Sequence, residues 1–188
     1  MTTVLSAPDT SKLHRLSDLT PELALREAAS FLAHLVGDPA FLDTYILPLL
    51  EDAREAQGWY VARHYESQDG SYSLQIFVWP PGSETKIHDH TSWGAFYCTV
   101  GSVVEERYER LDDGCRLDHA RLKKVWQLSW STDDGASTVL PYDEGIHRVR
   151  NPGEEVAVSV HLYGPRLGSL DGRDYDPSRN YICDRTEA

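Results

Sequence analysis

The chain has 188 residues, of which 40% are hydrophobic and 26% are charged. This composition excludes disordered, collagen-like and coiled-coil proteins, and the length suffices for one domain with a sizeable core but not for two ordinary ones. We expect a flexible leader over residues 1–18 and a single domain over residues 19–188.

The net charge and the cysteines limit the kinds of binding partner and the cellular compartment that we expect. Lys and Arg number 18 against 30 Asp and Glu, so the formal net charge is -12, which repels nucleic-acid phosphates and anionic lipid headgroups. No apolar run approaches the roughly 20 residues that span a bilayer, and the N-terminus lacks the pattern of a secretory signal. The 3 cysteines form no CxxC pair, as is typical of a reducing compartment. We expect a cytoplasmic monomer that binds neither nucleic acid nor membrane.

The first part of the domain, residues 19–57, has the pattern of helices. Thr20 supplies a capping hydroxyl, and Pro21 occupies the first helical position, an arrangement that favours a helix start. Apolar residues then recur at helical spacing as far as the break at Gly37. A second amphipathic helix is predicted over residues 39–56.

After Gly58 the chain changes to short runs of β-branched and aromatic residues, separated by Gly, Asp, Asn and Pro. The expected strands are 60–65, 72–79, 93–108, 125–130, 138–140, 147–150 and 156–163. Strands this short and this closely spaced predict an antiparallel sandwich or small barrel over residues 58–164. The tail, residues 165–188, is expected to wrap irregularly. The predicted class is therefore mainly β, with N-terminal α-helices before a small antiparallel barrel.

Three histidines form the most informative pattern. His88 and His90 are two residues apart, so on a strand both side chains point to the same face and reach one atom. His147, from a distant strand, would complete a facial set of three ligands. Such a set leaves coordination positions open, as a catalytic metal requires and a closed four-ligand structural site does not. The alternative is that these imidazoles are structural groups of the barrel core.

The surrounding residues resemble known motifs. Residues 82–90, followed by Gly101, resemble the first cupin motif, and residues 145–151 resemble the second. Together with residues 157–163 they resemble the thiol dioxygenases of the cysteine dioxygenase superfamily, over roughly residues 60–173. The resemblance implies a cupin fold, a small antiparallel β-barrel or jelly roll.

The resemblance also implies a cofactor, which is a non-haem Fe(II) ion held by His88, His90 and His147. The sequence departs from the usual first cupin motif at Gly94, where a Glu ligand is common. The site would then consist of three histidines without a carboxylate.

Ser159, His161 and Tyr163 match the Ser-His-Tyr relay of these dioxygenases. Their spacing along a strand places all three on one face, so a hydrogen-bonded chain from serine through imidazole to phenol is geometrically reasonable. An exposed polar strand face is the alternative. Three nearby aromatic residues are expected to pack in the barrel: Trp79, Trp93 and Phe96.

A Cys-Tyr crosslink is a feature of animal-type members, which carry the cysteine five residues after the second metal ligand. Ala95 stands at that position here, and Cys98 lies three residues further on. An odd step along a strand reverses the face, so we expect no thioether crosslink.

Two arginines are candidates for binding a substrate carboxylate through the planar guanidinium. Arg63 lies close to where cysteine dioxygenases keep their carboxylate-binding arginine, and Arg173 is near where 3-mercaptopropionate dioxygenases have theirs. If both faced the pocket, a thiol with two carboxylates, such as mercaptosuccinate, would fit.

The resemblance predicts an Fe(II)-dependent thiol dioxygenase. Its partners would be dioxygen and a small thiol that carries a carboxylate: cysteine, 3-mercaptopropionate or mercaptosuccinate. The alternatives are a non-catalytic metal-binding cupin that senses a small molecule, and another metal-dependent cupin enzyme. Other metal-dependent cupin enzymes usually keep the Glu of the first cupin motif, and Gly94 stands in its place here.

Overall fold

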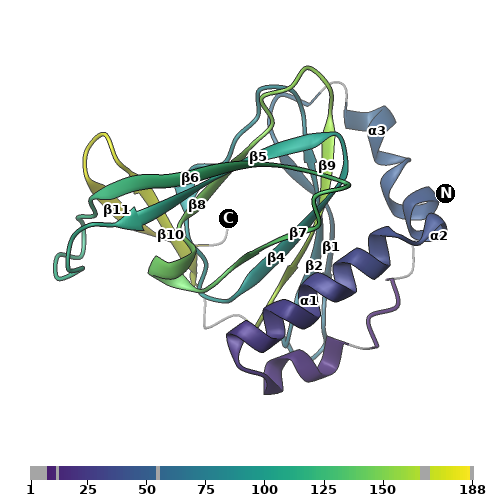
Figure 1. Ribbon diagram of the computed structural model, residues 1–188, viewed down its shortest axis with the longest axis horizontal. Coiled ribbons are helices and arrows are strands. Elements are labelled where there is room, and N and C mark those ends of the chain that lie inside the picture. Colours follow the sequence, from purple (N-terminus) through teal and green to yellow (C-terminus); the bar gives the residue numbers. More distant parts are fainter. Residues whose placement is uncertain (1–7, 12, 54–55, 166–169, 187–188) are drawn as a thin grey trace.

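The computed structural model describes residues 8–11, 13–53, 56–165 and 170–186. Helices lie along one side of two antiparallel β-sheets that face each other (Figure 1). The helical elements are η1 (Leu13–Asp18), α1 (Pro21–Val36), α2 (Pro39–Phe41), the π-helical turn η2 (Leu42–Ile46) and α3 (Leu49–Asp52). The predicted N-terminal helices are confirmed. The second predicted helix is interrupted, because Pro48 supplies no backbone N–H to the helical ladder and α3 begins directly after it.

The strands form two sheets whose pairs are all antiparallel. The first sheet has the order β1-β2-β9-β4-β7 and the second the order β11-β10-β3-β8-β5-β6. The strands of the first sheet are β1 (Tyr60–Glu66), β2 (Ser73–Trp79), β4 (Gly94–Val100), β7 (Ala136–Val139) and β9 (Ala157–Tyr163). Those of the second are β3 (Ile87–His88), β5 (Ser102–Arg110), β6 (Leu122–Ser131), β8 (His147–Arg150), β10 (Leu170–Asp176) and β11 (Tyr181–Thr186). The short 3-10 turn η4 (Tyr142–Gly145) leads into β8. The fold is the predicted, mainly β, cupin.

Three regions differ from the sequence-based expectations. The predicted strand 93–108 is two strands, β4 and β5, because Gly101 turns the chain with a φ of 67°, a conformation that favours glycine. The tail is a hairpin of β10 and β11 that extends the second sheet, where an irregular wrap was expected. Part of the expected leader is packed, since Leu13 and Leu16 of η1 are buried in the core; residues 1–7 and 12 lie outside the described residues.

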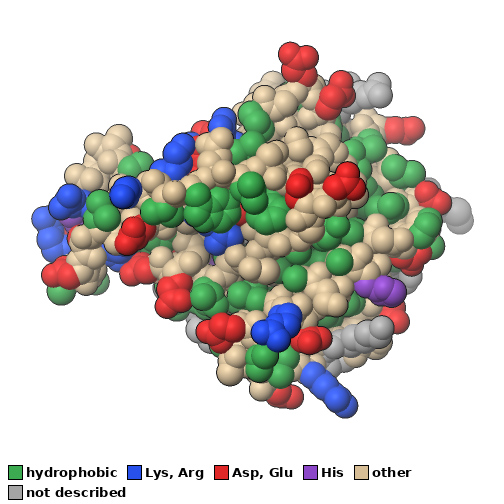
Figure 2. Space-filling model, viewed as in Figure 1, with side chains coloured by type: hydrophobic (Ala, Val, Ile, Leu, Met, Phe, Trp, Pro, Cys, Tyr) green, Lys and Arg blue, Asp and Glu red, His purple; other side chains and the backbone are tan. Residues whose placement is uncertain are grey.

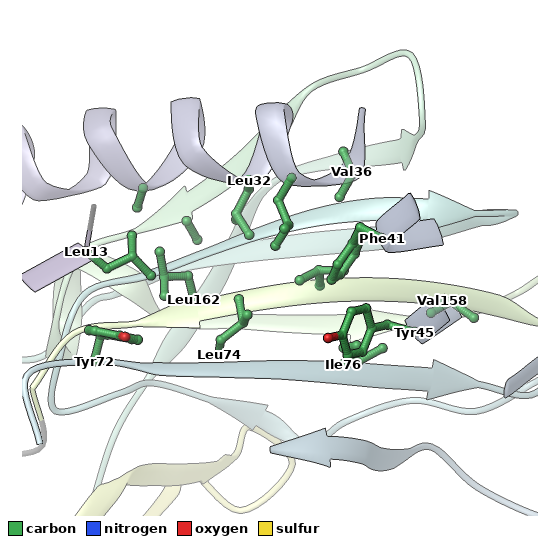
Figure 3. Packing of buried hydrophobic residues seen from close by; sticks show 14 of the residues in the cluster. Leu13, Leu32, Val36, Phe41, Tyr45, Tyr72, Leu74, Ile76, Val158 and Leu162 are labelled. Carbon is green, nitrogen blue, oxygen red and sulfur yellow. The ribbon is translucent and has the colours of Figure 1, made fainter. Parts of the chain in front are cut away.

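The main hydrophobic core lies between the helices and the outer face of the first sheet (Figure 3). Alternation along the strands supplies it. Leu74 and Ile76 of β2 and Val158 and Leu162 of β9 are fully buried on this side, against the buried face of α1, which includes Leu32. The opposite side chains of β2 and β9 therefore point into the space between the two sheets.

The surface carries dispersed charges. Figure 2 shows Asp and Glu side chains scattered over this face, with Lys and Arg gathered toward the end where β6 and β11 lie. Among the described residues, the helices are all too short or too polar to cross a membrane.

Replacing Ile76 with alanine tests how strongly the helices and the first sheet depend on each other. Ile76 is 0% exposed, so the Ile76→Ala variant leaves a cavity and should lose about 2–4 kcal/mol of unfolding free energy. Urea unfolding followed by circular dichroism measures the loss. Leu117→Ala is the control, because Leu117 is 97% exposed. A loss in Ile76→Ala no larger than in the control would contradict this account of the core.

Candidate metal centre and hydrogen-bonded relay

A cavity of about 400 Å³ opens between the two sheets. Its walls combine an aromatic side with a cluster of imidazoles. The aromatic lining residues include Trp59, Phe77 and Trp79. The lining imidazoles belong to His88, His90, His147 and His161.

Two short strands bring the three candidate ligands together. His88 ends β3 and His147 begins β8, and the two residues are directly paired in the sheet. His90 follows His88 by two residues. All three are buried, and their ligand nitrogens lie within 4.8 Å of one another. The Nε2 atoms of His90 and His147 are 3.2 Å apart, so the imidazoles converge on one point, as the spacing predicted.

The outward nitrogens of two imidazoles have partners that fix their orientation. The Nδ1 atom of His88 lies 2.9 Å from the carbonyl oxygen of Lys86. The Nδ1 atom of His147 lies 2.7 Å from Oε1 of Glu105. Both partners accept, so each Nδ1 carries the proton and each Nε2 is left with a lone pair for a metal. Three convergent neutral imidazoles suit a divalent transition metal and leave further coordination positions open.

Glu105 is a functional residue that the sequence analysis missed. Its side chain is fully buried on β5, where it also accepts from Ser137 Oγ at 2.6 Å and pairs with Arg107 at 2.8 Å. Burial alone would raise its pKa, but the contacts with His147, Arg107 and Ser137 lower the pKa to about 2. A charged carboxylate therefore lies behind a ligand imidazole. The alternation of side chains along the strand could have indicated that Glu105 is buried, because Glu105 lies on the same face as the buried Val103.

The relay residues form a continuous hydrogen-bonded chain. Ser159 Oγ lies 2.7 Å from His161 Nε2, and His161 Nδ1 lies 3.0 Å from the Tyr163 hydroxyl. Trp79 Nε1, which only donates, is 2.7 Å from Ser159 Oγ. With that donor in place, Ser159 donates to Nε2 and His161 donates from Nδ1 to the phenol oxygen. The Tyr163 proton can then point into the cavity, beside His90, whose ring centroid is 5.0 Å from that of Tyr163.

The environment of His161 keeps its imidazole neutral and holds the ring in place. The ring lies between Phe77 and Phe96, with centroid distances of 4.1 Å and 5.1 Å. Burial lowers the pKa of His161 to about 3. The direction of the chain toward Tyr163 is therefore maintained at neutral pH.

The structure places Gly94, rather than Ala95, against the relay tyrosine. Gly94 pairs with Tyr163 in the sheet, whereas Ala95 pairs with Leu162 and faces the helices. A Cβ atom on Gly94 would lie 3.0 Å from two carbons of the Tyr163 ring. Ala95, the position considered for a crosslinking cysteine, thus faces away from the Tyr163 ring. Cys98 is a free, buried cysteine.

The structure brings neither candidate arginine to the cavity. A β-bulge after Val61 places Arg63 opposite Ile76, on the helix side of β2, and its guanidinium donates to the carbonyl of Ala62 at 2.8 Å. Arg173 pairs with Asp89, behind the ligand segment. The expectation that both arginines face the pocket is therefore not met. A bulge reverses the alternation, and it leaves little trace in a sequence.

The one lysine or arginine among the described residues that line the cavity is Lys86. Its Nζ atom pairs with Asp174 at 2.9 Å. Among the described residues, the cavity lining thus adds little positive charge that a carboxylate does not compensate.

The carboxylate of Glu105 should tighten metal binding through His147. We expect Glu105→Gln, which preserves shape but removes charge, to weaken metal affinity about 10- to 100-fold. Titration of the metal-free protein with Co(II), followed by absorbance, measures the affinity. Glu109→Gln is a matched control, because Glu109 is exposed on the same strand. Equal affinities for the two variants would remove Glu105 from the metal centre.

Several solved structures are similar to parts of this chain at low sequence identity. TT1209 from Thermus thermophilus is 20% identical, over 56% of this chain and 84% of that chain, with a TM-score of 0.40. A cupin 2 conserved barrel domain protein from Salinispora arenicola CNS-205 is 14% identical, over 56% and 73%, with a TM-score of 0.39. Oxalate oxidase in complex with the substrate analogue glycolate is 15% identical, over 61% and 55%, with a TM-score of 0.45. The model of the family cysteine dioxygenase type I matches residues 56–176, more than half of the chain, and the chain therefore belongs to this family.

Proposed function

We propose that the protein is an Fe(II)-dependent thiol dioxygenase that oxidises a small, carboxylate-bearing thiol to its sulfinate. One observation carries the proposal: a Ser159–His161–Tyr163 chain ends beside three convergent imidazoles, to which the described residues add no carboxylate ligand. Membership of the cysteine dioxygenase type I family supports it. Cysteine and 3-mercaptopropionate are the first candidates. The family match supports these monocarboxylates, whereas the argument from two arginines, on which mercaptosuccinate depended, does not hold because neither Arg63 nor Arg173 lines the cavity.

The reaction balances without an organic cofactor. One thiol and one dioxygen give one sulfinic acid: the S–H and O–O bonds break, two S–O bonds form, and the thiol proton ends on a sulfinic oxygen. The sulfur loses the four electrons that dioxygen gains. Ferrous iron, held by His88, His90 and His147, would supply the redox centre at which thiolate and dioxygen meet.

The chain's own residues orient the reactants. Trp79, Ser159 and His161 hold the Tyr163 hydroxyl so that its proton points into the cavity, where it can donate to a substrate or oxygen atom. This donor is in place before the reactants bind, because the rings of Phe77 and Phe96 lie on either side of His161.

Oxygen uptake by iron-loaded protein, measured with cysteine and 3-mercaptopropionate, tests the proposal. We expect one dioxygen consumed per thiol and sulfinate detected by mass spectrometry. His147→Ala, which removes a ligand, should lose both iron and uptake. Iron bound at all three histidines without uptake for any thiol would overturn the proposal and favour a non-catalytic metal-binding cupin.

Replacing Tyr163 with phenylalanine removes the donated proton but preserves the ring. We expect Tyr163→Phe to bind iron normally and to lower kcat for sulfinate formation about 10- to 100-fold, with dioxygen consumed in excess of the sulfinate formed. Tyr97→Phe is the control, because the Tyr97 hydroxyl donates to the Thr132 carbonyl at 2.8 Å, away from the cavity. An unchanged kcat in Tyr163→Phe would show that the relay plays no part in the reaction.

A further inference from the structure

Asp89 occupies an unusual position between two metal-ligand candidates. It separates His88 from His90 in the sequence and is 0% exposed. Its side chain points away from the two imidazoles, toward β10. A buried carboxylate is costly unless a cation and hydrogen bonds compensate its charge. The residues around Asp89 therefore show what holds this segment in place.

Arg173 of β10 compensates the negative charge of the Asp89 carboxylate through both its backbone N–H and its guanidinium. Its backbone N–H donates to Oδ1 of Asp89 at 2.7 Å, and its Nε donates to Oδ2 at 2.7 Å. The Nη2 atom lies 2.5 Å from the same Oδ2. In return, the backbone N–H of Asp89 donates to the Arg173 carbonyl at 3.0 Å. The hydroxyl of Tyr175 completes the set at 2.8 Å.

The strand approaches Asp89 so closely that only glycine fits beside Arg173. Gly172 has a φ of 115°, and a Cβ atom there would meet the Asp89 carbonyl oxygen. This conformation is one that side chains rarely adopt. The contact between β10 and the ligand segment is thus built into the backbone as well as into the ion pair.

The same guanidinium also reaches the turn that precedes the third histidine. Nη2 of Arg173 lies 2.6 Å from Oδ1 of Asp143 in η4, and the guanidinium carbon lies 5.3 Å from the centroid of the Tyr142 ring. Tyr142 donates its backbone N–H to the His90 carbonyl at 2.8 Å. One side chain therefore connects the segment of His88 and His90 with the turn that leads to His147.

We propose that Arg173 is a positioning residue for the metal centre, which it holds together through Asp89 and Asp143. This inference rests on metal binding by the three histidines and does not depend on thiol oxidation. It assigns Arg173 a role different from the substrate contact that the sequence suggested. A substrate contact would need the guanidinium in the cavity, whereas here it binds two carboxylates behind the ligands.

Metal affinity tests the proposal without any thiol or oxygen. We expect Arg173→Ala to weaken Co(II) binding to the metal-free protein about 10- to 100-fold, the range found when groups that orient metal ligands are removed. Arg179→Ala is the matched control, because Arg179 follows β10, is exposed and pairs with Asp176, away from the ligand segment. Unchanged affinity in Arg173→Ala would overturn the proposal.

A pair of neutral variants keeps the test valid if Arg173→Ala does not fold. Arg173→Gln leaves the Asp89 charge uncompensated, whereas Asp89→Asn combined with Arg173→Gln removes both charges. We expect the double variant to regain at least part of the affinity that Arg173→Gln loses, as a coupled pair requires. A double variant that binds Co(II) no better than Arg173→Gln would contradict the pairing.

Kinetics separates positioning from substrate binding. Loss of positioning should lower kcat at saturating iron for 3-mercaptopropionate and for 2-aminoethanethiol, which has no carboxylate. A substrate-binding arginine would instead raise KM for 3-mercaptopropionate alone and leave Co(II) affinity unchanged. If no variant or wild-type protein oxidises thiols, the affinity result still decides the role of Arg173, while the proposed function fails independently.

Discussion

The two-sided alternation of β9 is the constraint on which the rest of the structure depends. Val158, Val160 and Leu162 pack against the helices, and the intervening Ser159, His161 and Tyr163 face the cavity. A slip of one residue would exchange the two sets and bury the relay among apolar side chains. The N-terminal helices thus do more than cover a sheet. By burying one face of β9, they fix the register in which the relay can form.

Gly94 couples the ligand set to the relay. The ring of Tyr163 occupies the space that a side chain at position 94 would need. A Glu ligand at this position and a tyrosine at 163 therefore compete for the same volume. The lack of a carboxylate ligand at position 94 and the presence of the phenol are two consequences of one packing arrangement, which explains why both features occur in the same chain.

The sequence allowed the local patterns of the site to be predicted, but not its tertiary partners. Strand periodicity placed His88 and His90 on one face and made the relay spacing meaningful, and the structure brings these groups together. Arg63 was misplaced because a β-bulge reverses its side. Glu105 and Arg173 act through neighbours that are distant in sequence, and their spacing carries no signal of the contact. The tail strands were missed because few of their residues are apolar, although Tyr175 and Ile182 are buried in a hydrophobic cluster.

The distribution of charge around the centre follows from the same arrangement. Two carboxylates, Glu105 and Asp89, lie behind the imidazoles, and each is paired with an arginine, Arg107 or Arg173. Neither carboxylate reaches the metal position, so their charge orients ligands instead of cancelling that of the ion. Three neutral imidazoles leave the charge of a divalent ion available to an incoming group, which favours the thiolate over the thiol. A carboxylate ligand would have reduced that preference. The glycine that admits the Tyr163 ring therefore also preserves the electrostatic attraction for the sulfur that the proposed reaction oxidises.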